Sequence, residues 1–293
     1  MQDCMKTPIA VLPSHLVLDP LLQNWLAEDI GRGDRTTQAL ALANSSYGQA
    51  KWVVKEAGIV AGLPIAARVF QLLDHQSQFV PQVTEGQWCD RGQVIAQIEG
   101  RLDALLTGER VALNLAMRLS GIASMTHRYV EKIADLPAQL VDTRKTTPGL
   151  RILEKYATQV GGAMNHRMGL DDGVMLKDNH IAASGGIRAA IEQVRSRIPY
   201  PLTIEVETET LNQVVEALDG GADIIMLDNM PLEQMSHAVD LIRNRNDRIK
   251  IEASGNVTLE TIRSIAETGV DYISSSAPIT RSTWLDLSMK MGL

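Results

Sequence analysis

Charged side chains that could bind or transform a small anion occupy one stretch of the chain, and their signs are separated. The cations come first: Arg144, Lys145, Arg167 and Lys177, with His166 among them. The acids follow: Glu205, Glu207, Asp228 and Glu252. Arginine offers a planar fork for carboxylate or phosphate, and lysine offers a point charge. Acids can hold Mg²⁺ and ribose hydroxyls and can stabilise an oxocarbenium-like carbon. This segregation suits a reaction between anionic substrates that passes through a cationic centre.

The composition limits the partners of such a site. The formal net charge of -7 disfavours a general polyanion binder, so any anion site must be local, and we expect no nucleic-acid partner. The six histidines show no zinc-binding spacing. Cys4 and Cys89 are the only cysteines and lie far apart, as expected in a reducing compartment. No signal peptide or apolar run of membrane length is present, so we expect a cytoplasmic protein without a membrane partner.

Short apolar strands alternate with amphipathic helices from Leu140 onward. The expected strands are Leu140–Val141, Val174–Leu176, Leu202–Val206, Ile224–Leu227, Ile249–Ile251 and Tyr272–Ile273. The expected helices are near Leu150–Val160, Ile187–Ile198, Leu211–Leu218, Leu232–Ile242 and Leu259–Glu267. This alternation predicts right-handed crossovers and a parallel sheet.

Polar residues follow every one of these strands, and the carboxyl ends of parallel strands share one edge of a sheet. An α/β barrel builds its active site in this way. Because only six strands are clear, we expect an incomplete, open barrel. The alternative is an open doubly wound sheet, but no Gly-x-Gly-x-x-Gly turn follows an early strand. Ser254-Gly255-Asn256, at a strand-to-helix junction, offers backbone N–H groups as a phosphate seat.

The part before Leu140 has a different pattern. Residues 1–47 are expected to be largely helical, with a capped surface loop at 28–37. Strands within 48–61, 79–83 and 94–98 with a helix at 64–73 predict a small antiparallel α+β unit. One long helix is expected over 102–133, with a break or kink at Ser120-Gly121.

A polar stripe of Arg110, Asn114 and Arg118 runs along this long helix. It is either a solvated face or a functional one, and the residues alone leave both open. A further set of charged residues is expected to lie on surfaces as ordinary ion-pair partners: Arg151, Lys155, Asp171 and Asp172.

Motifs along nearly the whole chain resemble those of the quinolinate phosphoribosyltransferase family. The most specific are Asp142-Thr-Arg-Lys-Thr-Thr-Pro-Gly149 and Asn165-His-Arg-Met-Gly169. Others are Glu28–Thr37, Gly108–Asn114, Leu119–Ala123, Lys177–His180, Glu205–Glu207, Met226–Asn229 and Glu252–Asn256.

The resemblance implies an N-terminal open-faced α+β sandwich over 1–119, joined by 277–293, and an open α/β barrel over 120–276 that carries the active site. It implies a homodimer with shared active sites. The implied reaction transfers phosphoribosyl from phosphoribosyl pyrophosphate to quinolinate with loss of CO₂. The products are nicotinate mononucleotide and pyrophosphate, a step of NAD biosynthesis, and the implied cofactor is Mg²⁺.

The resemblance also implies roles for single residues. Arg144, His166 and Arg167 would bind the quinolinate carboxylates, joined by Arg110 of the partner subunit. Lys145 and Lys177 would contact quinolinate and the phosphates, and Glu205 and Asp228 would serve the metal and the ribose. Lys145, Glu205 and Asp228 form the implied catalytic set, and phosphate contacts are expected from Ser254, Gly255, Asn256, Ser274 and Ser276.

One segment departs from the family pattern. Ser276 stands where a glycine normally lets the backbone approach phosphate, and Pro278 removes a backbone donor. Two alternatives stay open: a related enzyme with another substrate, such as a pyridine monoacid or a molybdenum-linked ligand, and a barrel that binds ligand without turnover. The set Arg110, Arg144, His166 and Arg167 favours a dianion, and intact Glu205 and Asp228 favour turnover.

Overall fold

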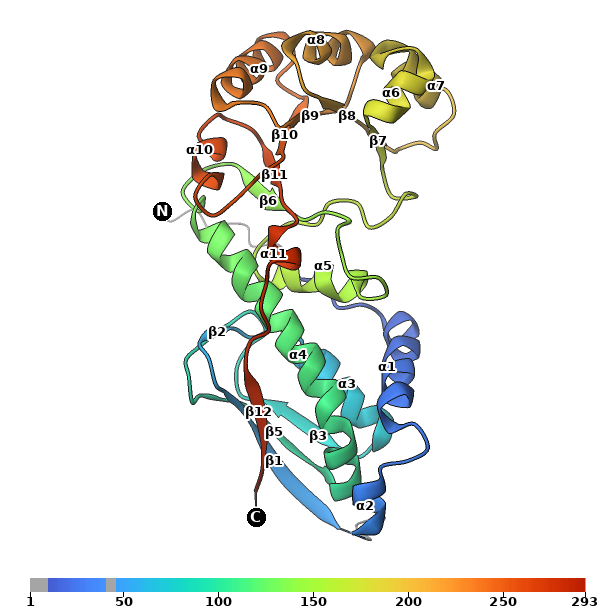
Figure 1. The fold of residues 1–293 in the computed structure, drawn as a ribbon, viewed down its shortest axis with the longest axis vertical. Helices are drawn as coiled ribbons and strands as arrows, with labels where there is room; N and C mark the ends of the chain where they lie inside the picture. Colours follow the sequence, from blue (N-terminus) through green and yellow to red (C-terminus); the bar gives the residue numbers. More distant parts are fainter. Residues whose placement is uncertain (1–9, 41–45, 293) are drawn as a thin grey trace. The chain divides into compact units, whose positions relative to one another are not determined.

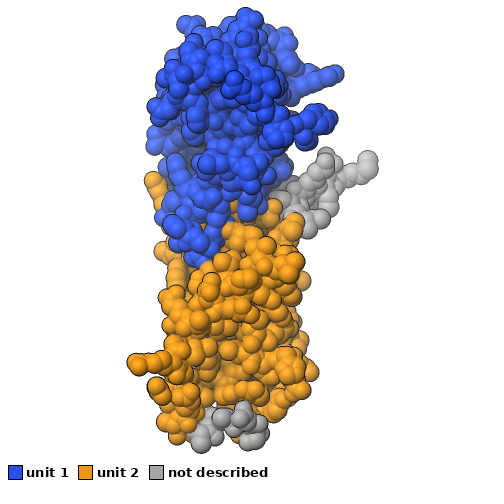
Figure 2. All heavy atoms as spheres, turned by 90° about the vertical axis from the view of Figure 1, so that its right-hand side faces the viewer, with its two compact units in different colours: residues 1–7, 128–151, 163–280 blue, residues 8–127, 152–162, 281–293 orange. Residues whose placement is uncertain are grey.

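The structure is a computed structural model that describes residues 10–40 and 46–292. Contacts divide the chain into two compact units, coloured separately in Figure 2. Unit 1 contains residues 128–151 and 163–280. Unit 2 contains residues 152–162 and 281–292 together with the described residues up to 127. The parts of 1–47 that fall in 1–9 and 41–45 lie outside the described residues.

Unit 1 is built on a six-stranded sheet in the order β6-β11-β10-β9-β8-β7. The strands are β6 (Gln139–Val141), β7 (Val174–Leu176), β8 (Ile204–Thr208), β9 (Ile224–Asp228), β10 (Lys250–Ser254) and β11 (Tyr272–Ser274). Every neighbouring pair is parallel. The sheet curves, and β6 and β7 form its two edges (Figure 1). This confirms the expected incomplete barrel.

Helices lie on the outer side of this curved sheet (Figure 1). They are α6 (Asp178–Ser184), α7 (Ile187–Arg195), α8 (Leu211–Gly220), α9 (Leu232–Arg245) and α10 (Ile262–Ala266). A further short helix, α11 (Ala277–Thr280), follows the last strand and is not part of this outer layer. Local sequence sets their ends. The Thr210 hydroxyl caps the start of α8, and Gly221 ends it in the left-handed conformation. The sequence did not predict α6 or α11.

Unit 2 contains a four-stranded antiparallel sheet in the order β12-β1-β5-β3. Its strands are β1 (Tyr47–Val54), β3 (Gln78–Pro81), β5 (Val94–Arg101) and β12 (Leu287–Gly292), with a short pair β2 (Gly58–Ile59) and β4 (Trp88–Cys89) beside it. Its helices are α1 (His15–Ile30), α2 (Arg35–Ala39) and α3 (Leu63–Leu73), most of α4 (Leu102–Glu131), and α5 (Arg151–Val160) after its first residue. The sheet and α3 share a core in which the rings of Trp52, Phe70 and Phe79 pack together.

The segment 28–37 is more ordered than the expected surface loop. Its first residues complete α1, and Asp34 begins α2. The Asp34 carboxylate accepts hydrogen bonds from the Thr37 backbone at 3.0 Å and from the Thr107 hydroxyl of α4 at 3.1 Å. These bonds lower the pKa of Asp34, those from Thr37 most strongly. The segment therefore ties the N-terminal helices to α4.

The start of α5 is buried, which corrects the expected surface position of Lys155. Lys155 and Glu154 are both 0% exposed. Arg118 of the polar stripe donates from its Nη2 to Glu154 at 2.7 Å and from its Nη1 to the Ser282 hydroxyl at 2.8 Å. Arg118 thus holds α5 and the C-terminal segment to α4 within unit 2. In the sequence, an amphipathic helix with charged residues gave no sign that these charges are inside.

The helix α4 continues through Gly121, so the expected break is wrong. A Cβ atom at Gly121 would overlap the backbone carbonyl of Thr283. Leu285 also donates its backbone N–H to Met117 of α4 at 3.0 Å. Gly121 therefore gives the C-terminal segment room to lie directly on the helix.

Replacing Gly121 by alanine should lower the free energy of unfolding by about 1–3 kcal/mol, because the added methyl group forces the backbone at Thr283 away from α4. Urea unfolding of the variant measures this. Gly292→Ala is the matched control, since the nearest atoms to its Cβ lie at 3.5 and 3.9 Å. Equal stability of the two variants would contradict the close approach.

No helix within residues 10–40 and 46–292 is long and apolar enough to cross a membrane.

Candidate active site

Acidic and polar side chains from three neighbouring strands share one face of the unit 1 sheet. The register pairs Ser254 of β10 with Asp228 of β9. Glu207 of β8 and Glu252 of β10 lie on either side of Met226. Since paired residues of neighbouring strands point to the same face, and the face alternates along each strand, all four polar side chains project to one side. Asp228 and Ser254 lie at the carboxyl ends of their strands, as the sequence predicted.

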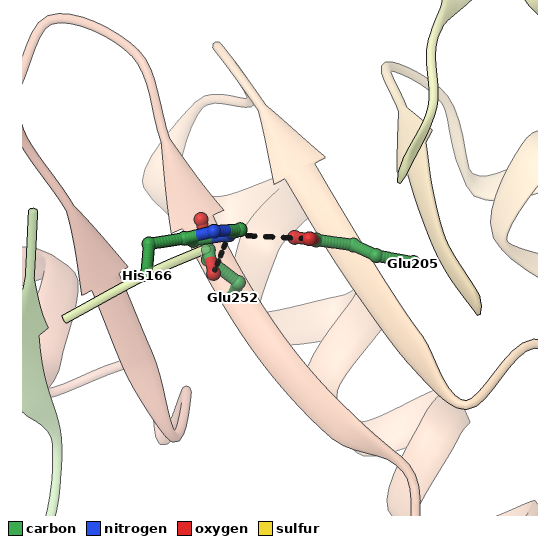
Figure 3. Close-up of side chains that lie close together, drawn as sticks. All are labelled: His166, Glu205 and Glu252. Carbon is green, nitrogen blue, oxygen red and sulfur yellow. Dashed lines mark ion pairs between the residues drawn. The ribbon is translucent and has the colours of Figure 1, made fainter. Parts of the chain in front are cut away.

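A buried group of three side chains lies below these strand ends. His166 reaches between Glu205 and Glu252 (Figure 3). Its Nε2 is 3.2 Å from Oε2 of Glu205 and 3.4 Å from Oε2 of Glu252. The two glutamates are 3% and 4% exposed. Oε1 of each glutamate is buried and has no hydrogen-bond partner.

The backbone of His166 is fixed from the other side. Asp142, directly after β6, is 2% exposed and accepts the His166 backbone N–H at 2.9 Å. The same carboxylate accepts the side-chain amide of Asn165 at 2.6 Å. Nδ1 of the His166 ring accepts the backbone N–H of Arg167 at 2.7 Å. Both ring nitrogens are therefore occupied by protein groups.

The proton state of His166 follows from these contacts. Burial lowers its pKa, but the hydrogen bonds and charges of Glu205 and Glu252 outweigh burial and raise the pKa to about 10. The contact at Nδ1 opposes a second proton, because a nitrogen that accepts a hydrogen bond carries none. Whether the ring carries one proton or two, a proton lies on Nε2, between the carboxylates. Burial raises the pKa of Glu205, and the bond from His166 offsets this only in part.

The charges of two arginines act on each other beside this group. Burial lowers the pKa of Arg167, and the charge of Arg144 adds to the effect, whereas Glu205 opposes it. The Arg167 side chain donates to the Gly173 carbonyl at 2.8 Å. Bringing two cations together is unfavourable unless an anion joins them, so this pair has the electrostatics of a small-anion site.

The loop that carries Arg144 and Lys145 is held by Arg151. Its guanidinium donates to the Thr146 hydroxyl at 3.0 Å and to the Met168 carbonyl at 3.1 Å. Arg151 is thus half-buried and structural, which corrects its expected place among surface ion pairs. Lys145 itself is exposed at the surface of unit 1. The expected surface positions of Asp171 and Asp172 are confirmed.

Lys177 lies just after β7 and pairs with Glu207. Its Nζ is 2.8 Å from Oε2 of Glu207, whose side chain is 16% exposed. The ring nitrogen Nδ1 of His180 accepts the Lys177 backbone N–H at 3.1 Å, which fixes the start of α6. A cation and an acid from neighbouring strands thus meet directly at the strand ends.

The turn after β10 is joined to the turn after β9. Asn256 donates its side-chain amide to Asn229 at 3.1 Å, and Asn229 donates to Asp228 at 2.9 Å. Both asparagines have positive φ, 50° and 53°. Gly255 has φ 97°, and a Cβ atom there would overlap the side chain of Asn229, so only glycine fits.

The sequence predicts a helix N-terminus at this turn, and that prediction is wrong. The helix α10 begins only at Ile262, six residues after Asn256. The N–H groups of Gly255 and Asn256 therefore belong to a turn, and any contact they make with phosphate cannot draw on a helix dipole.

The segment after β11 leads directly into α11. Ser274 and Ser275 are 5% and 6% exposed, and Ser276 is half-buried. Ser276 has no positive φ, so its backbone does not require glycine. Pro278 is the second residue of α11, where a backbone N–H would have no partner inside the helix, so it breaks no helical bond.

One group of described residues has the donor atoms of a metal site. Ligand atoms of His166, Glu205 and Glu252 lie within 4.8 Å of one another. The sequence had placed the metal on Glu205 and Asp228, and Asp228 is not part of this group. Glu252, Asp142 and Asn229 were missing from the expected site set. Their position in the sequence indicates all three, since each lies at or just after the end of a predicted strand.

Arg110 belongs to unit 2. Its side chain is 60% exposed, and Glu109 lies 3.9 Å away. The two arginines of the polar stripe therefore differ: Arg118 forms an ion pair with Glu154 inside unit 2, whereas Arg110 lies at the surface of unit 2.

Known proteins match the chain over nearly its whole length. Residues 34–120 match the family model of the quinolinate phosphoribosyl transferase N-terminal domain, and residues 122–290 match that of the C-terminal domain. A Synechocystis sp. protein described as a probable carboxylating nicotinate-nucleotide pyrophosphorylase is 61% identical over 284 residues, covering 97% of this chain and 96% of the relative. The decarboxylating quinolinate phosphoribosyltransferase 1 of Nicotiana glauca is 39% identical over 311 residues, covering 99% and 87%. The crystal structure of NadC from Streptococcus pyogenes has a TM-score of 0.90 and 43% identity, covering 96% of this chain and 98% of that chain.

Proposed function

The chain belongs to the quinolinate phosphoribosyltransferase family, and from this membership we propose how its described residues carry out the family's reaction. It catalyses the transfer of phosphoribosyl from phosphoribosyl pyrophosphate to quinolinate with loss of CO₂, giving nicotinate mononucleotide and pyrophosphate in NAD biosynthesis. The unfavourable effect of the Arg144 charge on the pKa of Arg167 is the observation that links this reaction to the site.

Quinolinate carries two adjacent carboxylates, and two cations that repel each other in the free protein suit such a dianion. In the proposal, Arg144 and Arg167 bind the carboxylates directly. His166 supports them from below, because both of its ring nitrogens are already bound to Glu205, Glu252 and the Arg167 backbone. This changes the role that the resemblance implied for His166, from a direct ligand to a support.

The sugar donor is also an anion, so the site must first bring like-charged reactants together, which is chiefly a positioning task. Lys145 and Lys177 lie after the first two strands in sequence and would screen the phosphates. The turn that contains Ser254, Gly255 and Asn256 would contact the donor from β10. Ser274 and Ser276 would do so from β11.

Magnesium fits the mouth better than the buried group. Glu207, which pairs with Lys177 in the free protein, and Asp228 offer hard oxygen donors on one face of neighbouring strands. Glu205 lies deeper, since its side chain is 5% exposed and that of Glu207 is 16% exposed. We therefore assign the ion to Asp228 with Glu207, with Glu205 behind them. When bound, Mg²⁺ neutralises the leaving pyrophosphate.

The remaining chemistry needs no catalytic base from the chain. As pyrophosphate leaves C1′, the ring nitrogen of quinolinate attacks and becomes cationic. That nitrogen then stabilises the electron pair left at C2 when CO₂ departs, and C2 takes up a proton from solvent to give nicotinate mononucleotide. The residues of the site hold the reactants in line and balance their charge. The decisive experiment incubates the protein with quinolinate, phosphoribosyl pyrophosphate and Mg²⁺ and measures nicotinate mononucleotide and CO₂. Absence of both products would refute the activity, and full activity in excess chelator would refute the metal.

The proposed assembly is a homodimer in which Arg110 of one subunit reaches the quinolinate of the other. Two observations support it: the resemblance, and a long, exposed cation on a helix in which another arginine, Arg118, is used internally. An exposed charge of this kind can join an anion in a partner subunit without a cost of desolvation in the free chain.

Ser276→Gly should lower the KM for phosphoribosyl pyrophosphate several-fold and leave the KM for quinolinate nearly unchanged. Ser276 does not need glycine for its own backbone, so any gain must come from space at the phosphates. Steady-state kinetics with each substrate varied in turn measures this. A change in quinolinate affinity alone would place Ser276 elsewhere in the site.

A further inference from the structure

Glu252 lies in the middle of the unit 1 sheet and takes no direct part in the reaction described above. It is on β10, its residue is 4% exposed, and its Oε2 lies 3.4 Å from Nε2 of His166. A carboxylate in such surroundings is costly, because burial removes its hydration. Its Oε1 has no hydrogen-bond partner, so the cost is offset mainly through the contact with His166.

Glu205 makes the matching contact from the neighbouring side. The two carboxylates approach the same nitrogen at 3.2 and 3.4 Å, one from β8 and one from β10. Because the two strands lie on either side of β9, the ring of His166 is clamped across three strands of the sheet (Figure 3). A single acceptor would hold one nitrogen but would let the ring swing about that contact.

The other edge of the ring carries the backbone of Arg167. Nδ1 accepts the Arg167 N–H at 2.7 Å, so the orientation of the ring fixes the residue that bears the guanidinium. The chain from Glu252 through His166 to Arg167 is thus continuous, and each step is a polar contact between buried or half-buried groups. Nothing else in the described residues makes a polar contact with Nε2 of His166.

We propose that Glu252 is a positioning residue for quinolinate, acting through His166 on Arg167. Glu205 shares this task. The inference rests on the proposed function, because it assumes that Arg167 binds a quinolinate carboxylate. His166, Glu205 and Glu252 thus form a rigid support beneath the bound dianion. In a metal site, by contrast, the unpartnered Oε1 atoms of the two glutamates would bind a cation.

Three variants separate the contact from the charge. Glu252→Asp keeps the charge but withdraws the carboxylate by about 1.5 Å, the length of one carbon–carbon bond. Glu252→Gln keeps an oxygen acceptor without the charge, and Glu252→Ala removes both. Glu216→Asp, the same shortening on the exposed side of α8, is the matched control.

The KM for quinolinate should rise roughly ten- to a hundredfold in the aspartate and alanine variants, as expected when a binding group is misplaced. The KM for quinolinate should change least in the glutamine variant, since the amide oxygen can still accept a hydrogen bond from Nε2. The KM for phosphoribosyl pyrophosphate should stay near the wild-type value in all three variants. Both KM values should stay near wild type in the control, Glu216→Asp. An equal loss for both substrates would indicate a general structural defect and overturn the proposal.

The link through His166 is tested by a double-mutant cycle with His166→Asn. If Glu252 acts through the ring, Glu252→Asp has little further effect once the ring is gone. The same fold-change in both backgrounds would show that Glu252 acts independently, and the inference would fail. If His166→Asn leaves the KM for quinolinate unchanged, the proposed role of His166 fails first and the inference falls with it.

A readout without turnover keeps the proposal testable for variants of low activity. Nitrogen-15 spectra of the histidine rings should show a changed Nε2 resonance of His166 in Glu252→Gln, because one of its two acceptors has lost its charge. An unchanged resonance would contradict the contact. Stoichiometric binding of Zn²⁺ to the wild type that Glu252→Gln abolishes would identify a metal site instead.

Discussion

A mixture of Arg110→Ala and Lys145→Ala subunits is expected to regain about a quarter of the wild-type activity, although each variant alone is nearly inactive. The expectation follows from the proposed dimer, in which each site takes Arg110 from one chain and Lys145 from the other. Arg110 lies in unit 2 with a side chain 60% exposed, and Lys145 lies in the loop after β6 of unit 1.

The quarter comes from counting sites. Random pairing of equal amounts makes about half of the dimers heterodimers. In each heterodimer one site carries both defects and the other carries neither. About half of the dimers thus have one intact site of two, and the activity of the mixture is measured after mass spectrometry shows that subunits have exchanged.

A matched mixture tests the same point without changing the protein concentration. Arg144→Ala and Lys145→Ala both alter the loop of unit 1, so their heterodimers have one defect in each site and should stay inactive. If the Arg110→Ala mixture also stays inactive after exchange, Arg110 acts within its own chain, and the shared-site dimer is wrong.

The sequence predicted the barrel well because the relevant signal is local. Each strand of unit 1 is a short apolar run, and β6 to β10 are each followed in the sequence by a predicted amphipathic helix, whereas none is predicted after β11. The register then follows from parallel pairing, which places Asp228 and Ser254 side by side at the strand ends. Residues whose position depends only on being last in a strand could be found in this way.

The contacts inside the site could not be found from the sequence, because they depend on how far each side chain reaches. Glu205 and Glu207 are two residues apart and share a face, yet one is bonded to His166 below and the other to Lys177 at the mouth. A pattern of alternating residues cannot distinguish these depths. The sequence therefore predicts the metal on Glu205 and Asp228, whereas we propose Glu207 and Asp228 as its ligands.

The sequence does not predict the buried charge in unit 2, for a related reason. Lys155 lies in an amphipathic helix among other polar residues, and its spacing alone allows a solvated position. Only the packing of α5 against α4, with Arg118 bonded to Glu154, makes this side of the helix internal. The pattern around Gly121 likewise predicts a break, because the segment that needs the space at Gly121, around Thr283, lies more than 150 residues later.

Nicotinic acid should be a very poor substrate, with a kcat/KM about 10⁴-fold or more below that of quinolinate. It has the same ring nitrogen and one carboxylate but lacks the second, adjacent carboxylate. A site built around two cations then leaves one of them without its anion, and unpaired charge in a partly buried site is strongly unfavourable. Initial rates at varied concentration of each acid give the ratio.

The physical origin of this selectivity lies in the pair Arg144 and Arg167. The pKa of Arg167 is lowered by burial and then by the charge of Arg144, so the two charges already oppose each other in the free site. Two adjacent carboxylates relieve that repulsion, and a single carboxylate relieves it only in part. Benzene-1,2-dicarboxylate, which has both carboxylates and no ring nitrogen, should therefore compete with quinolinate, whereas benzoate should not.

Arg167→Ala provides the internal test of this explanation. Removing Arg167 removes both the repulsion and the partner of the second carboxylate. The kcat/KM for quinolinate should therefore fall far more than that for nicotinic acid, and the ratio between the two values should become smaller. Comparable turnover of the two acids by the wild type would refute the dianion site. An unchanged ratio in Arg167→Ala would mean that selectivity arises elsewhere, and the support of Arg167 by His166 would then have no bearing on substrate choice.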